Sequence, residues 1–193
     1  MTERDARKSV VGDARSRIVR AGIRCVVRDG LADASMAAIA QEAEVSKALL
    51  HYHFADRAQL LGEMVTLIGR RLITREQGAL ERDEISAPVD VLWRWLDVEL
   101  ERGELRALLA LATLRQDMVR EAVEEVSVAR RTSSATVVEY VFARLGLTAR
   151  VPLTLIADAS VAFVDGLALD RGSSRDSRVS FDVFWLAMLS LGD

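Results

Sequence analysis

Apolar residues recur at intervals of three and four along most of the chain, which is the spacing of one face of an α-helix. In residues 13–29, for example, Ile18, Ala21 and Cys25 lie on one stripe that ends before Gly30. The same spacing recurs in eight further segments, at 36–43, 47–54, 56–76, 89–100, 105–114, 118–145, 152–169 and 181–191. The pattern therefore predicts an all-α protein of about nine helices.

Two of the predicted helices are short and lie close together, within residues 35–54. Ser35 and Ser46 are placed as their N-caps, where each hydroxyl can accept a hydrogen bond from an unpaired backbone N–H. Isolated helices this short are unstable in water, so we expect the helix over 13–29 to pack against them. Their order predicts a helix-turn-helix, an arrangement that places its second helix in the major groove of DNA.

Charge is divided unevenly along the chain. The net charge of the whole sequence is −3, but residues 1–75 carry +4 and residues 76–193 carry −7. A basic first third suits a DNA-binding head, joined to an acidic body that does not touch DNA. Residues 1–12 form a polar arm with Arg4, Arg7 and Lys8, expected either to be disordered or to contact DNA.

The sequence also indicates where the protein works. Its single cysteine, Cys25, cannot form an intramolecular disulfide, and its place on an apolar stripe favours a core residue. The first residues lack the apolar segment of a signal peptide. The longest apolar run, 183–189, is far shorter than the ~20 residues that span a bilayer. We therefore expect a cytoplasmic protein with no membrane partner.

The run VSKALLHYHF, preceded by MAAIAQEA and followed by an Asp-Arg helix start, resembles the DNA-binding segment of the TetR family of bacterial transcriptional regulators. The resemblance implies a DNA-binding domain over 12–72, with its helix-turn-helix at 35–54, and a ligand-binding and dimerisation domain over 73–193. Two residues depart from the family pattern: Glu44 stands where glycine is usual, and His51 where tyrosine is commoner. If the turn needs a positive φ, Glu44 costs about 1 kcal/mol.

Residues at the start of a recognition helix reach the base edges. Lys47 can donate to guanine or to a phosphate, whereas Ala48 and Leu49 offer apolar contact, for example to a thymine methyl. The resemblance implies phosphate contacts further along, although each histidine could instead be a surface or packed residue. The predicted DNA-binding residues are Ser35, Met36, Ser46, Lys47, Ala48, Leu49, His51, Tyr52, His53 and Arg57.

The resemblance implies a mostly apolar pocket for a small molecule in the second domain. Either tryptophan could instead be plain core, and Asp158 could form a salt bridge to an arginine. The ligand candidates are Trp93, Trp95, Thr113, Arg115, Tyr140, Asp158 and Ser160. The last two helices have little polar face, which predicts that they pair with those of a second copy in a four-helix bundle. The interface candidates are Phe163, Leu167, Phe181, Phe184, Trp185 and Met188.

These observations predict a homodimeric transcriptional repressor, released from a palindromic operator by a small-molecule effector. Its partners would be double-stranded DNA, a second copy and that effector, with no cofactor and no metal. A ligand-dependent activator of the same fold, a structural adaptor and a helical small-molecule-binding protein or enzyme without DNA binding stay as alternatives. An enzyme is disfavoured, because the sequence has no nucleophile–base pair, metal-ligand cluster or glycine-rich phosphate loop.

Overall fold

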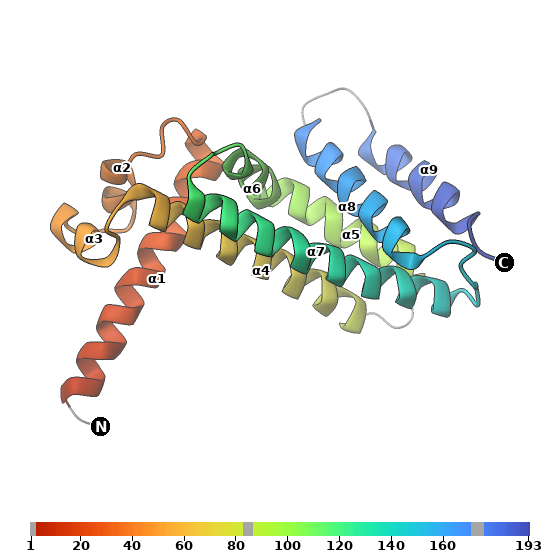
Figure 1. Cartoon of the computed structure of the whole chain (residues 1–193), viewed down its shortest axis with the longest axis horizontal. Coiled ribbons are helices and arrows are strands. Elements are labelled where there is room, and N and C mark those ends of the chain that lie inside the picture. The colour runs from red at the N-terminus through yellow and green to blue at the C-terminus, as the bar shows by residue number, and fades with distance from the viewer. Residues whose placement is uncertain (1–2, 83–86, 171–175) are drawn as a thin grey trace. The chain divides into compact units, whose positions relative to one another are not determined.

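The computed structural model describes residues 3–82, 87–170 and 176–193, and within them the chain forms nine α-helices and no strand (Figure 1). The all-α prediction is confirmed. The helices are α1 (Glu3–Asp29), α2 (Met36–Glu42), α3 (Lys47–His53), α4 (Arg57–Arg82), α5 (Pro88–Arg102), α6 (Glu104–Ala112), α7 (Asp117–Arg144), α8 (Leu153–Leu169) and α9 (Ser177–Leu189). None of these helices is both long enough and apolar enough to cross a bilayer.

Two helices begin earlier than the apolar pattern predicts. Residues 3–12 continue α1, so the disorder expected as one alternative for the polar arm is wrong for them, while its contact with DNA stays a prediction. This segment contains no proline, and five of its ten residues are charged, among them glutamate, arginine and lysine, which favour a helix. The last helix begins at Ser177 rather than at Phe181, because Asp176 caps it by accepting hydrogen bonds from the backbone N–H groups of Arg178 and Val179.

The described chain divides into two compact units, of which the first contains residues up to 68 together with 107–124. The sequence predicts that residues 107–124 belong to the second domain, whereas in the structure they group with the first unit. In this first unit α2 and α3 pack on α1, as Figure 1 shows. Its core is fully enclosed and is built from Ile18, Ala21, Cys25, Ile39, Leu50, Phe54, Leu60, Leu61 and Met64. The core role predicted for Cys25 is confirmed.

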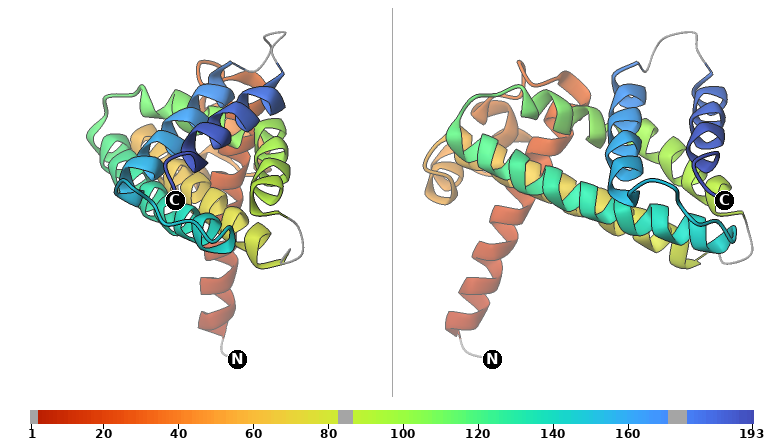
Figure 2. Two further views of the ribbon diagram at one scale, coloured as in Figure 1. Left: turned by 90° about the vertical axis from the view of Figure 1, so that its right-hand side faces the viewer. Right: turned by 45° about the vertical axis from the view of Figure 1, so that its right-hand side comes forward.

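The second unit contains residues 69–106 and 125–193. In it α4 and α7 pack so closely that a Cβ built on Gly69 would lie 2.4 Å from Cγ1 of Val126. The antiparallel pair α8 and α9 lies side by side (Figure 2), with the rings of Phe163 and Phe184 stacked between them at a centroid distance of 4.2 Å. Helix α5 packs against both α8 and α9.

Candidate functional sites

The helix-turn-helix is closed by the caps that the sequence predicts. The hydroxyl of Ser35 accepts a hydrogen bond from the N–H of Ala38 at 3.2 Å, and that of Ser46 accepts one from the N–H of Leu49 at 3.1 Å. Each cap satisfies one of the unpaired backbone donors at a helix start. The bounds of α2 and α3 are therefore set locally, by one serine before each helix.

The turn between α2 and α3 requires a left-handed residue, and Glu44 occupies that position with φ 55°. The N–H of Val45 bonds to the carbonyl of Ala40 and that of Glu44 to Gln41, both at 3.0 Å, which is the Schellman pattern of helix termination. A glutamate there costs about 1 kcal/mol relative to glycine. The turn nevertheless keeps the geometry that its usual glycine would give.

Helix α3 presents a polar and aromatic face away from the core. Lys47, Ala48 and His51 are exposed, and Tyr52 is the most exposed large hydrophobic side chain of the described residues, at 74%. Ser46 lies exposed beside them, while Leu49 and Met36 are half-buried. The structure thus brings together most of the side chains predicted to contact DNA on one accessible face.

Two of the predicted DNA contacts instead face the interior. His53 is buried because it shares a helix face with Leu50, and its pKa is lowered by that burial and, less strongly, by the charge of Arg15. Its carbonyl accepts a hydrogen bond from Arg15, and its Nε2 is buried without a partner among the described residues. The imidazole is therefore a packing group of the interior, and its role as a phosphate contact is corrected.

Arg57 also differs from its predicted role. Its guanidinium is partly buried and donates to the carbonyls of Leu31, at 3.0 Å, and Ala34, at 3.3 Å. These bonds fix the segment between α1 and α2, so the structure assigns Arg57 to holding the head together rather than to a phosphate. On the neighbouring surface Arg28 and Arg24 pair with Glu42, and these hydrogen bonds hold the pKa of its carboxyl below the usual value.

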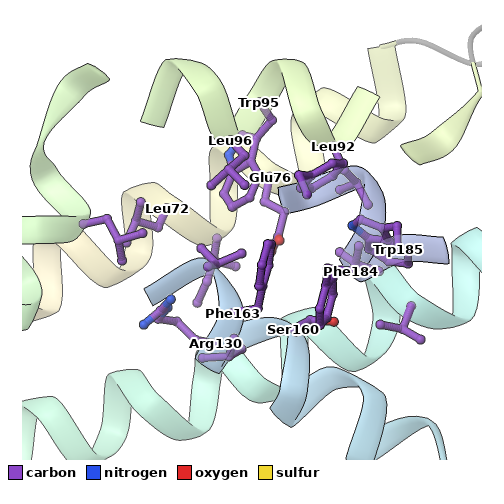
Figure 3. Close-up of a pocket in the computed structure, with 18 residues that line it drawn as sticks. Leu72, Glu76, Leu92, Trp95, Leu96, Arg130, Ser160, Phe163, Phe184 and Trp185 are labelled. Carbon is purple, nitrogen blue, oxygen red and sulfur yellow. The ribbon is translucent and has the colours of Figure 1, made fainter. Parts of the chain in front are cut away.

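The second unit contains a pocket with about 680 Å³ of empty space, part of it open to solvent (Figure 3). Its wall is mostly apolar and aromatic, as expected of a small-molecule site. Helices α4 to α9 each contribute to it. The lining residues are Leu72, Ile73, Glu76, Leu92, Trp95, Leu96, Leu105, Arg130, Ser134, Val137, Val138, Ser160, Val161, Phe163, Val164, Phe181, Phe184 and Trp185.

Few polar groups in this wall are available to a ligand. The hydroxyls of Ser134 and Ser160 donate to backbone carbonyls, at 3.3 and 2.8 Å. Burial raises the pKa of Glu76 to about 7, against the opposing effects of a hydrogen bond from Ser133 and the charge of Arg130. The indole Nε1 of Trp95 is buried with no partner among the described residues. Glu76 and Trp95 therefore carry the unused hydrogen-bonding capacity of the pocket.

Of the seven ligand candidates, only Trp95 and Ser160 line the pocket. Trp93 packs on Phe181, with a centroid distance of 5.3 Å. Asp158 pairs with Arg131 at 3.5 Å on the surface, which is the salt bridge kept open as its alternative. The other three candidates also lie outside the pocket wall. The ring of Tyr140 lies under the guanidinium of Arg144, and Thr113 and Arg115 are exposed just after α6.

The sequence reasoning missed Glu76 and Arg130. A usable signal was present for Glu76, because Leu72, Glu76 and Leu80 are spaced by four residues and so share the inward face of α4. A carboxylate in an otherwise apolar stripe is a candidate site residue. Arg130 gives no such signal, since α7 carries charged residues on several faces.

The predicted dimer residues also point inward. Phe163, Phe181, Phe184 and Trp185 line the pocket, Leu167 is buried, and Met188 is half-buried. This corrects their assignment to an outer face. The apolar side chains that α8 and α9 do expose are Leu155, Leu169, Val179, Val183 and Leu186, of which Leu186 is 70% exposed.

Comparisons with known proteins agree with this geometry. Residues 18–64 match the sequence model described as bacterial regulatory proteins, tetR family. A transcriptional regulator from Rhodococcus sp. Rha1 has a similar structure, with a TM-score of 0.73 and 19% identity over 93% of this chain and 97% of that one. A TetR transcription regulator from Haloarcula marismortui gives 0.74 and 17%, over 94% and 100%. The multidrug binding protein EbrR, complexed with imidazole, gives 0.62 and 24%, over 90% and 94%. No curated protein sequence matches the chain.

A capped helix-turn-helix with an exposed second helix, on an all-helical body, defines a DNA-binding transcriptional regulator. Residues 18–64 therefore carry the sequence pattern of the tetR family of bacterial regulatory proteins, and the chain as a whole shares the fold of solved transcriptional regulators. The resemblance found in the sequence is thereby confirmed.

Proposed function

We propose that this regulator is a homodimeric, cytoplasmic repressor that binds a palindromic operator and is released by a small molecule. Its DNA-binding domain would cover residues 12–72 and its ligand-binding and dimerisation domain residues 73–193. The observation that carries the proposal is the exposed face of α3, where Lys47, His51 and Tyr52 lie free of the core. Side chains placed in this way can enter the major groove while the buried residues hold the helix.

The DNA-binding part is tested by removing Lys47. Replacing it with alanine is expected to weaken operator binding about 5- to 100-fold, because a lysine on a base edge or phosphate contributes about 1–3 kcal/mol. The measurement is a titration of a fluorescent duplex from upstream of the protein's own gene, at two salt concentrations and with an unrelated duplex as competitor. Specific binding should survive the competitor and weaken steeply with salt.

Arg106→Ala is the matched control, since it removes the same charge from an exposed position on α6, outside the helix-turn-helix. It should leave operator affinity unchanged. If Lys47→Ala binds as tightly as the unaltered protein, Lys47 does not contact DNA. If the contact is to a phosphate, the slope of log affinity against log salt should also fall by about one.

The homodimer is supported by the exposed apolar stripe of α8 and α9. Leu155, Ala162, Gly166 and Leu169 share one face of α8, and a Cβ on Gly166 would meet open space. Small residues on such a face allow a second helix to approach closely. Sedimentation equilibrium at micromolar concentration should give twice the 21.3 kDa of one chain. A monomer under these conditions would rule out the four-helix interface.

Release by a ligand is supported by the place of α4, which supplies Leu72, Ile73 and Glu76 to the pocket wall and begins directly after α3. A similar fold, that of EbrR, holds a small molecule, imidazole. The same duplex titration with a ligand present decides the sign of the response. Loss of binding supports a repressor, whereas tighter binding supports the ligand-dependent activator.

A further inference from the structure

Two charged residues line the pocket of the second unit, and only one of them is paired with an opposite charge among the described residues. Glu76 and Arg130 are its charged lining residues, and both carboxylate oxygens of Asp165 already accept from Arg130, at 3.2 and 2.6 Å. Glu76, by contrast, receives one hydrogen bond from the described residues, from the neutral hydroxyl of Ser133 at 3.2 Å. The carboxyl of Glu76 is therefore the lining charge that no cation of the described residues neutralises directly.

Aromatic rings surround this carboxyl. Figure 3 shows Glu76 between Trp95 and Phe163 in the pocket, with the ring of Phe184 beside that of Phe163. Ring faces attract a cation through their quadrupole, and a carboxylate adds a charge-assisted hydrogen bond. An anion would be repelled here, and a purely apolar ligand would leave the carboxyl with the Ser133 hydroxyl as its one hydrogen-bond donor among the described residues.

We propose that this pocket binds a ligand carrying one ammonium group on an apolar body, with Glu76 as its ion-pair partner. The inference rests on the proposed ligand-binding function and names the chemical class of the ligand. The ammonium is held by the carboxylate between the rings of Trp95 and Phe163. The apolar body packs against the aliphatic wall, and the unpaired indole N–H of Trp95 is left to donate to an oxygen of the same ligand.

The proposal has a pH signature. The groups that bear on Glu76 are Ser133 and Arg130 from α7, with Asp165 from α8 holding Arg130, while the lining residues from α5, α6 and α9 are apolar or aromatic. The pKa of Glu76 is raised to about 7, so near neutral pH a bound ammonium must displace a proton. Affinity for an ammonium should therefore rise about tenfold from pH 6 to pH 8, as the carboxyl ionises.

The test uses three probes with one body: 4-phenylbutylamine, 4-phenylbutan-1-ol and 4-phenylbutanoate. The amine stays protonated between pH 6 and pH 8, since alkylammonium groups titrate near pH 10. Binding is measured by calorimetry and by quenching of the fluorescence of Trp95 and Trp185, which both line the pocket. The amine is expected to bind about tenfold or more tightly than the alcohol, a preference that corresponds to one charge-assisted contact.

Glu76→Gln should remove that preference and the rise with pH, while keeping a side chain that can bond to Ser133. Glu139→Gln is the matched control, because Glu139 is exposed on α7 and its substitution removes the same charge outside the pocket. It should leave both properties intact. Glu76→Asp keeps the charge and should keep the preference, which separates loss of the carboxylate from loss of the fold.

The possible failures are distinguishable. If the alcohol or the carboxylate binds as tightly as the amine, the pocket remains a ligand site and the ammonium class is wrong. If none of the three probes gives heat or quenching, the pocket itself is not a site for ligands of this size, and both the class and the proposed ligand response fall.

Discussion

Replacing Arg75 with methionine is expected to lower the free energy of unfolding of the second unit by about 3–5 kcal/mol. Glu99 is only 1% exposed, and its carboxylate accepts from Arg75 at 2.6 Å. The same guanidinium nitrogen lies 2.7 Å from Glu104. Methionine preserves the apolar stem but leaves the Glu99 carboxylate buried beside Arg102 alone, at the longer distance of 3.5 Å. A buried charge that loses its partner costs far more than the pair itself contributes.

Urea unfolding followed by tryptophan fluorescence measures this effect in the right place, because Trp93, Trp95 and Trp185 all lie in the second unit. Arg131→Met is the control: its pair with Asp158 is exposed and lies in the same unit, so the change should be below about 0.5 kcal/mol. The double variant with Glu99→Gln should recover part of the loss, since no buried charge remains. An unchanged midpoint for Arg75→Met would show that Glu99 does not depend on this partner.

Phe54→Ala is expected to destabilise the first unit by about 3–5 kcal/mol. The ring is completely buried, with an exposed fraction of 0%, and the guanidinium of Arg15 lies 4.4 Å from its centroid. Truncation leaves a cavity and removes that cation–π contact. The first unit has no tryptophan, so its unfolding is followed by circular dichroism.

Tyr52→Ala is the matched control for Phe54→Ala. Tyr52 lies two residues earlier in the chain but is 74% exposed, so Tyr52→Ala should change stability by less than about 0.5 kcal/mol. The same substitution should weaken operator binding if Tyr52 contacts DNA. Equal stability of the Phe54→Ala variant and the unaltered protein would contradict the enclosed core described for this unit.

Local chemistry explains what the sequence predicts well. The apolar periodicity identifies all nine helices of the described chain, and Ser35 and Ser46 mark their starts because a cap needs only its own helix. The positive φ expected at Glu44 is likewise set by neighbouring residues, through the termination of α2. The family motif also predicts which residues of α3 are exposed, because the register of a single short helix determines them.

Features that depend on packing between distant helices are predicted less well. Helices α8 and α9 are apolar on several faces, so periodicity cannot decide which face is turned inward, and their aromatic residues were assigned to the wrong side. Trp93 and Trp95 are the same residue type two positions apart. The positions of the neighbouring helices decide that Trp93 packs on Phe181 and that Trp95 lines the pocket. For His53 the spacing of three residues from Leu50 indicates the buried face of α3, whereas the family motif implies a contact with DNA.

The close approach at Gly69 determines how α4 can respond to a molecule in the pocket. The methyl groups of Val126 lie against the backbone of Gly69, so sliding α4 along α7 at this point would drive them into the next side chain on α4. Gly69 is therefore the point at which α4 is held against α7. Glu76 lies about 10 Å further along the same helix, at the rise of an α-helix. We therefore expect a ligand that pushes on this carboxyl to tilt α4 about the contact at Gly69 rather than to shift its register against α7.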